Sequence, residues 1–141
     1  MKYHFKIHKE EDGFWAQCLE IPGCVTQADS RDELSVNMEE AINTLIQEPE
    51  GSNFLAPLPD DSYKPSQSII EVKVDPQIAM GFWLRYNRIK KGLTQEDVAK
   101  KLGMKNIFSY QRLERGCNTS IAMLARLVDV FPLFKVDAVF N

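Results

Sequence analysis

The sequence predicts an α+β protein with two parts: a small N-terminal antiparallel sheet carrying one packed helix, then an all-α domain. Short alternating apolar runs fill the first part of the chain, whereas the apolar spacing is helical from residue 76 onward. The charge changes sign at the same place. Residues 1–75 hold 15 acidic and 6 basic side chains, a net of −9, while residues 76–141 hold 11 basic and 5 acidic ones, a net of +6. We therefore expect one domain at residues 1–75, with a Pro-rich linker at about 49–68, and a second at 76–141.

Three runs near the start of the chain have the alternation of half-buried strands. In the first, Tyr3, Phe5 and Ile7 fall on every second position, so we expect their side chains to face the core. Asp12-Gly13 between two such runs is a hairpin signal, because glycine accepts the backbone angles of a tight turn. The expected strands are residues 3–9, 14–20 and 24–27, with a turn at Ile21-Pro22-Gly23 before the third.

A helix and a further strand complete the first domain. Ser30 and Glu33 have the spacing of a capping box, and the apolar residues that follow recur at helical spacing as far as a helix end near Pro49. Residues 69–74 alternate again and predict a strand that completes the sheet. A single helix on this sheet buries the apolar face of both. The helix residues expected in the core are Leu34, Met38, Ala41, Ile42, Leu45 and Ile46.

The first domain shows no convincing catalytic set, and we expect no enzymatic activity, metal or cofactor. A metal nuclease could use carboxylates such as Asp12, Glu20, Asp29 and Asp32, but Asp12 belongs to a turn and Asp29 flanks a helix cap. His4 and His8 share the strand face opposite the core. They lack a third ligand, so exposed strand histidines explain them better than a metal site.

The cysteines indicate a reducing compartment. Cys18, Cys24 and Cys117 are odd in number and form no CxxC pair, so we expect reduced thiols with packing roles. The charged, alternating N-terminal residues do not resemble a signal peptide. We expect a cytoplasmic protein without membrane contact.

Residues 93–116 predict two short helices joined at a glycine. Thr94 caps the first, with Asp97 at the third helical position, and Gly103 ends it. The second helix carries Tyr110 and Leu113 on its inner side, together with Ile107. Two short helices meeting at a glycine turn form a helix-turn-helix, whose second helix reads the major groove of DNA.

This stretch resembles the helix-turn-helix of the phage-repressor-like (XRE) family. The matching residues are Leu93-Thr94-Gln95, Leu102-Gly103 and Glu114-Arg115-Gly116, and the likeness covers about residues 78–141, with flanking helices expected at 82–91 and 120–129. The segment from Gly103 to Gly116 is one residue longer than the family pattern. The extra residue falls in Met104-Lys105-Asn106, which leaves the start of the recognition helix open.

The resemblance implies which residues face DNA. Gln95 should touch phosphate, Asn106 should cap the recognition helix, and Ser109 and Arg112 should project outward. Arg112 could grip a guanine edge, while Ile107 and Phe108 could pack on thymine methyls or on the protein itself. The expected DNA-binding residues are Gln95, Lys105, Asn106, Ser109, Gln111 and Arg112.

Basic residues surround this motif and favour DNA binding over a purely structural helical domain. For a single side chain such as Lys100 or Lys101, a solvated helix face explains the charge equally well. The surrounding set is Arg85, Arg88, Lys90, Lys91, Lys100, Lys101, Lys105, Arg112 and Arg115.

The last residues, 130–140, are apolar for a chain end. They either fill the core of the helical domain or form a contact between two copies. Repressor-type domains read two half-sites about one helical turn apart, so a homo-dimer or higher homo-oligomer is expected.

The first domain resembles the HicB antitoxin family. The matching features, in order, are Met1-Lys2-Tyr3, Glu11-Asp12-Gly13-Phe14, the run 20–29 that contains Ile-Pro-Gly-Cys, the helix with Glu39-Glu40-Ala41-Ile42, and Pro57-Leu58-Pro59. The likeness covers about residues 1–75. It implies a partial ribonuclease-H-like fold that neutralises a small basic toxin, HicA, which cleaves mRNA.

Together the two resemblances imply an antitoxin that binds a HicA-like ribonuclease and represses its own operon by binding operator DNA. Two alternatives remain at this point: a ligand-sensing transcriptional regulator without a toxin partner, and a nuclease with a DNA-targeting domain. A neighbouring short basic reading frame would favour the antitoxin over the sensor.

Overall fold

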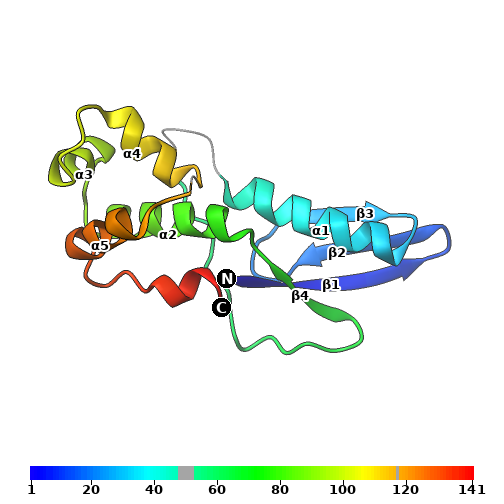
Figure 1. The fold of residues 1–141 in the computed structure, drawn as a ribbon. Helices are drawn as coiled ribbons and strands as arrows, with labels where there is room; N and C mark the ends of the chain where they lie inside the picture. Colours follow the sequence, from blue (N-terminus) through cyan, green and yellow to red (C-terminus); the bar gives the residue numbers. More distant parts are fainter. Residues whose placement is uncertain (48–52, 117) are drawn as a thin grey trace. The chain divides into compact units, whose positions relative to one another are not determined.

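A computed structural model describes residues 1–47, 53–116 and 118–141 of the chain. It divides into two compact units, one formed by Met1–Ile46 with Ala56–Asp75 and the other by Gln47–Leu55 with Pro76–Asn141. The first unit holds an antiparallel sheet and one helix, and the second is helical (Figure 1). The α+β class predicted from the sequence is therefore confirmed.

The sheet has the strand order β3-β2-β1-β4, and every neighbouring pair is antiparallel. The strands are β1 (Lys2–Glu10), β2 (Gly13–Cys18), β3 (Val25–Ala28) and β4 (Ile69–Lys73). The additional strand is confirmed as β4, which pairs with β1 so that Tyr3 lies opposite Val72. The second strand ends at Cys18 rather than Glu20, because the backbone N–H of Cys18 already donates to the Cys24 carbonyl at 2.9 Å and closes the turn.

The predicted β1–β2 hairpin is present, with Glu10 opposite Gly13 and a two-residue loop at Glu11-Asp12. The glycine therefore begins β2 instead of lying in the loop. It has a φ of 152°, and a Cβ placed there would lie 2.6 Å from the Ala28 carbonyl oxygen of β3. Glycine is needed at this position because β3 approaches the backbone so closely.

Helix α1 (Arg31–Ile46) packs on the sheet and buries Leu34, Met38, Ile42 and Ile46, while Ala41 and Leu45 are only half-buried. The Ser30 hydroxyl accepts from the Glu33 N–H at 3.2 Å, as predicted. The Glu33 carboxylate returns to the Asp29 N–H at 3.3 Å, so the reciprocal bond is shifted by one residue from the expected capping box. The helix ends at Ile46, and Pro49 lies outside the described residues.

Residues 53–68 contain no helix or strand, as expected for the Pro-rich segment, whose residues 49–52 lie outside the described part. From Ala56 onward the segment belongs to the first unit, where the Tyr3 hydroxyl donates to the Pro57 carbonyl at 2.8 Å. This packing corrects one expectation. His4 is 3% exposed, not an exposed strand histidine, because its Nδ1 contacts the Glu20 carboxylate at 2.6 Å beneath this segment.

The second unit consists of α2 (Pro76–Lys90), α3 (Gln95–Lys101), α4 (Ile107–Glu114), α5 (Ile121–Val130) and a short 3-10 helix, η1 (Val136–Val139). Pro76 starts α2, as proline suits a first helical turn. Gly81 lets α2 approach the end of α4, since a Cβ there would lie 2.9 Å from the Gly116 nitrogen and closer still to the Glu114 carbonyl. Within the described residues, no helix combines the length and apolar character that a bilayer span requires.

The first of the two roles expected for the C-terminal residues is confirmed, and the second stays a prediction. Phe131, Phe134 and Val139 are buried and fill the core of the second unit. Leu133 and Phe140 are 87% and 57% exposed, so part of the apolar tail remains available to a second copy.

Candidate nucleic-acid interface

Local hydrogen bonds define both helices of the predicted motif. The Thr94 hydroxyl accepts from the Asp97 N–H at 3.0 Å and the Asp97 carboxylate accepts from the Thr94 N–H at 2.9 Å, which confirms the capping box. These bonds lower the pKa of the Asp97 carboxyl, so it caps the helix as an anion. Gly103 has a φ of 68° and turns the chain out of α3.

The start of the second helix, which the sequence left open, is set by Asn106. Its side-chain oxygen accepts from the Ser109 N–H at 3.1 Å, so α4 begins at Ile107. The extra residue is therefore accommodated in the turn before the helix, not within it. This fixes which α4 side chains point outward, because each helical residue advances the direction by about 100°.

A buried ion pair holds α4 against α2. Arg88 Nε lies 2.5 Å from Glu114 Oε1, Arg88 Nη2 lies 3.3 Å from Glu114 Oε2, and both side chains are about 5% exposed. Arg88 Nη1 also donates to the Leu93 carbonyl at 3.1 Å, which fastens the loop before α3. Burial, together with the neighbouring Glu114 carboxylate, raises the pKa of Tyr110 beside this pair. In the sequence, Glu114 stands out only as part of the closing Glu-Arg-Gly motif, because no local pattern links residues 26 apart.

A chain of hydrogen bonds links Glu114 of this ion pair to two of the expected DNA-binding residues. Gln95 Nε2 donates to Glu114 Oε2 at 2.9 Å, and Gln111 Nε2 donates to Gln95 Oε1 at 3.0 Å. Both glutamines are half-buried. The structure therefore brings Gln95 of α3 and Gln111 of α4 together and orients them through Glu114. The sequence predicted each residue but not the contact between them.

The other expected residues lie at the start and along the outer side of α4. Lys105 and Arg112 are exposed, and no ion pair found in the described part of the chain engages either. Asn106 is exposed but its oxygen is occupied by the cap, and the Ser109 hydroxyl lies 3.3 Å from it. Long cations of this kind contact phosphate or guanine edges, whereas the Asn106–Ser109 pair chiefly shapes the helix start.

Two of the basic residues predicted to surround the motif are not on its surface. Arg85 and Arg88 are each 5% exposed, so neither can reach a phosphate. Arg88 neutralises Glu114, and the Arg85 guanidinium lies over the Phe82 ring at 5.8 Å from its centroid. The exposed cations that remain on α3, on α4 and in the residues that flank α4 are Lys100, Lys101, Lys105, Arg112 and Arg115.

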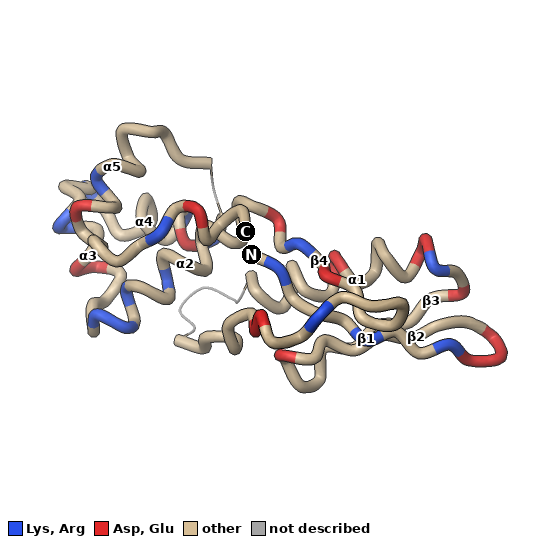
Figure 2. Tube along the Cα trace, turned by 90° about the horizontal axis from the view of Figure 1, so that it is seen from below, with Lys and Arg blue, Asp and Glu red and all other residues tan. Residues whose placement is uncertain are grey.

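The first unit has a broad, open pocket of about 900 Å³ at the edge formed by β2, β3 and the start of α1. Four carboxylates line it, from Glu10, Asp12, Asp29 and Glu33, and its lining contains no lysine or arginine. Figure 2 shows the acidic positions of the β1–β2 turn within this unit. An electronegative concave surface of this kind suits a cationic partner.

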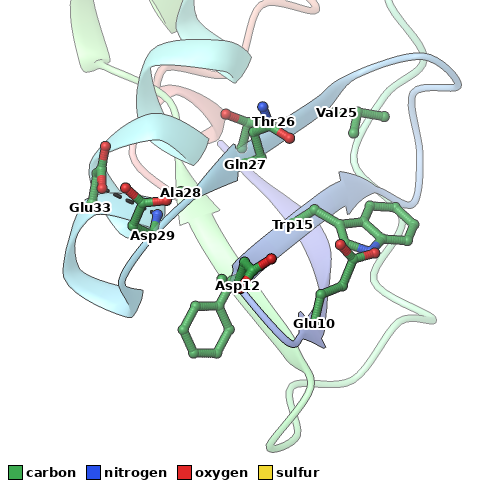
Figure 3. A pocket seen from close by; sticks show the side chains of 11 residues that line it. Glu10, Asp12, Trp15, Val25, Thr26, Gln27, Ala28, Asp29 and Glu33 are labelled. Carbon is green, nitrogen blue, oxygen red and sulfur yellow. Dashed lines mark hydrogen bonds between the residues drawn. The ribbon is translucent and has the colours of Figure 1, made fainter.

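Apolar side chains contribute to the same pocket. Trp15 and Val25 line one side of it, and the Asp29–Glu33 hydrogen bond lies at the other (Figure 3). Val25 is 53% exposed, and the Trp15 ring stacks on His8 with centroids 4.0 Å apart. The Arg31 guanidinium lies over the Phe14 ring at 5.8 Å, so a cation already rests on an aromatic face here. Aromatic and apolar side chains at the centre with polar groups at the rim are typical of a protein-binding surface.

Of the carboxylates weighed for catalysis, Asp12 and Asp29 line this pocket, whereas Glu20 is paired with His4. Among the residues that the structure describes, no group of three or more His, Cys, Asp or Glu side chains could hold a metal ion. The buried Glu20 accepts from the His4 N–H at 3.0 Å and from the Asp60 N–H at 3.3 Å, so it ties the 56–68 segment to the sheet. Both oxygens of the Glu20 carboxylate are therefore engaged in contacts that hold the fold.

Cys18 and Cys24 are buried free thiols, and Cys117 lies outside the described residues. A hydrogen bond in which the Cys18 thiol donates to Cys24, together with burial, raises the pKa of Cys18. The same bond lowers the pKa of Cys24. Their burial at the sheet end supports the packing role that the sequence predicts.

Comparison with known proteins identifies the second unit. A helix-turn-helix family model matches residues 84–133, so the chain carries an XRE-type helix-turn-helix DNA-binding domain. The chain is also similar to the UPF0150 protein of Archaeoglobus fulgidus, with 42% identity over 48 residues, 33% of this chain and 70% of the relative. The UPF0150 protein of Thermoplasma acidophilum is 40% identical over 48 residues, with the same coverage of both chains.

Removing Glu114 should strongly destabilise the second unit. Glu114→Leu leaves Arg88 charged and buried without its partner, and we expect the free energy of unfolding to fall by about 3–5 kcal/mol. Urea denaturation of the full chain measures this. The double variant Arg88→Met/Glu114→Leu removes both charges and should recover most of the loss.

The exposed Lys100–Glu96 pair, with N–O distance 3.3 Å, gives the matched control. Glu96→Ala should cost about 0.5 kcal/mol or less, because solvent screens this pair. A Glu114→Leu variant as stable as Glu96→Ala would show that the buried pair does not anchor α4.

Proposed function

The chain belongs to the UPF0150 family, and on this premise we propose that it is a cytoplasmic antitoxin that also represses its own operon. In this proposal the first unit binds and neutralises a small basic, HicA-like toxin that cleaves mRNA. The second unit binds operator DNA as a homo-dimer or larger homo-oligomer.

The observation that carries the proposal is the pairing, in one chain, of a DNA-binding domain with an acidic protein-binding surface. The helix-turn-helix supports a DNA-binding regulator. The pocket of the first unit combines four carboxylates with Trp15 and Val25. A ribonuclease must present cations to RNA phosphates, so an anionic surface that covers those cations would block the substrate.

Affinity for such a toxin needs more than charge. Exposed ion pairs contribute little each, so tight binding depends on a few apolar or aromatic side chains that lose water on contact. Trp15 and Val25 are available for this within the pocket. The carboxylates chiefly raise the rate of association and select a basic partner.

DNA binding also favours a symmetric assembly. Helix-turn-helix proteins read two half-sites about one turn apart, which calls for two copies. Phe131, Pro132 and Leu133 line a small apolar cavity of about 180 Å³ in the second unit. The exposed Leu133 beside this cavity makes the C-terminal segment our candidate for the contact between copies.

Arg112→Ala should weaken sequence-specific DNA binding by about 1–3 kcal/mol and relax the base preference at one position. Fluorescence anisotropy with the DNA upstream of the gene measures both effects. About six phosphate contacts would give a slope near −5 for log K against log salt. Lys9→Ala, an exposed cation of the first unit, serves as the control and should leave affinity unchanged.

Leu133→Asp should shift the protein toward monomers in light scattering and weaken operator binding, although Leu133 reads no base. A charge at an exposed apolar contact loses burial and must be desolvated. The neighbouring Phe134 is unsuitable for this test, because it is 5% exposed and a charge there would disrupt folding. Leu58→Asp, in the first unit, is the matched control. Unchanged mass and affinity in Leu133→Asp would place the contact elsewhere.

Charge reversal in the acidic pocket should impair toxin neutralisation. We expect Glu10→Lys/Asp12→Lys to slow association with the product of the neighbouring basic reading frame about tenfold at low salt. Surface plasmon resonance measures the rate, and co-expression reports growth rescue. Residues 1–75 alone should rescue growth, since the DNA-binding unit is not required.

The control variant Glu40→Lys/Asp61→Lys makes the same charge change at exposed positions outside the pocket lining. It should retain near-normal association. Equal loss in both variants would mean that net charge matters and the pocket does not. No association of the unaltered chain with that product would contradict the antitoxin role, while leaving DNA binding intact.

A further inference from the structure

The outer side of α4 carries a single aromatic residue between two cations. Phe108 is 61% exposed, and Lys105 and Arg112 are also exposed. Phe108 and Arg112 are four residues apart on α4 and therefore share one side of the helix, while Lys105 lies in the turn before it. The buried side chains Tyr110 and Leu113 lie on the opposite side.

The surroundings of Phe108 determine what can cover it. A protein partner that buried this ring would also desolvate Lys105 and Arg112, which is costly unless it supplied matching anions. DNA supplies both kinds of contact, since phosphates flank the groove and each thymine presents one methyl group inside it. The second helix of a helix-turn-helix is the one that enters the major groove.

We propose that Phe108 is a specificity-determining residue that selects thymine by packing on its C5-methyl group in the major groove. The methyl is the apolar feature that distinguishes a thymine edge from the other three bases. This inference rests on the proposed DNA-binding function and adds the base that the protein prefers. Lys105 and Arg112 hold the helix in the groove, and Phe108 reads one position.

Replacing thymine with uracil tests this directly, because uracil keeps the base pair and lacks only the methyl group. The full-length protein is first used to enrich a duplex from a random-sequence pool. Each thymine of that duplex is then replaced by uracil, one at a time. Each half-site should contain one thymine whose replacement by uracil raises the Kd of the unaltered protein about fourfold. This is the effect of losing the burial of one methyl-sized group.

The same duplexes are measured with variants at position 108. Phe108→Ala removes the contact from both half-sites of the proposed dimer, so it should bind the thymine duplex about fifteenfold more weakly and show no further loss with uracil. Phe108→Leu, which keeps an apolar side chain, should retain sensitivity to uracil. Val36→Ala removes a comparably exposed apolar group from α1 and should behave as the unaltered protein does. Thermal unfolding verifies that all variants are folded.

The outcomes separate this inference from the proposed function. An enriched duplex whose binding is unaffected by uracil at any position overturns the role of Phe108 and leaves DNA binding intact. Uracil sensitivity that persists in Phe108→Ala assigns the methyl contact to another residue and also overturns it. If no duplex is enriched, sequence-specific DNA binding itself fails.

Discussion

The second unit depends on one buried interaction, the ion pair between Arg88 of α2 and Glu114 of α4. Two charges in an apolar interior are stable together and costly apart, so α4 cannot leave α2 without a large loss. Glu114 also accepts from Gln95, and Gln95 from Gln111, so the same carboxylate orients polar groups on the side that we propose faces DNA. Gly81 is the steric counterpart of this arrangement, because it permits the backbone approach that brings the two charges together. Stability and the shape of the reading surface therefore share one origin.

The net charge counted from a sequence overstates the charge that is exposed to a binding partner. Arg85 and Arg88 contribute to the +6 of residues 76–141, and Glu114 offsets part of it, yet all three side chains are buried. Phosphates can meet only the cations on the surface, chiefly those of α3, α4 and the turn between them. In the first unit, by contrast, acidic side chains are concentrated on one exposed surface, so their charges add at the same place. They are the four carboxylates that line the open pocket, from Glu10, Asp12, Asp29 and Glu33. Position, more than net charge, decides which molecules each unit attracts.

Local signals predicted most of the elements, and long-range contacts account for most of what was missed. Alternation identified all four strands, and the caps at Ser30 and Thr94 act as expected, apart from the shifted Glu33 bond. Each of these rules concerns residues within a few positions of one another. His4 and Glu20 are 16 residues apart, and Arg88 and Glu114 are 26 apart, so no periodicity reveals that they meet. The acidic pocket was equally hidden, because it forms only when β3 and the start of α1 lie beside the β1–β2 hairpin.

The cap at Asn106 has a consequence for recognition that reaches beyond helix stability. A helix that began one residue earlier or later would carry a differently directed set of side chains, since each step rotates the face by about 100°. With the start at Ile107, the inner side receives Tyr110 and Leu113, and Phe108 and Arg112 are left outside. The extra residue in the preceding turn puts Lys105 just ahead of this face without disturbing the helix. The residue that caps α4 thus determines which side chains the helix-turn-helix offers to DNA.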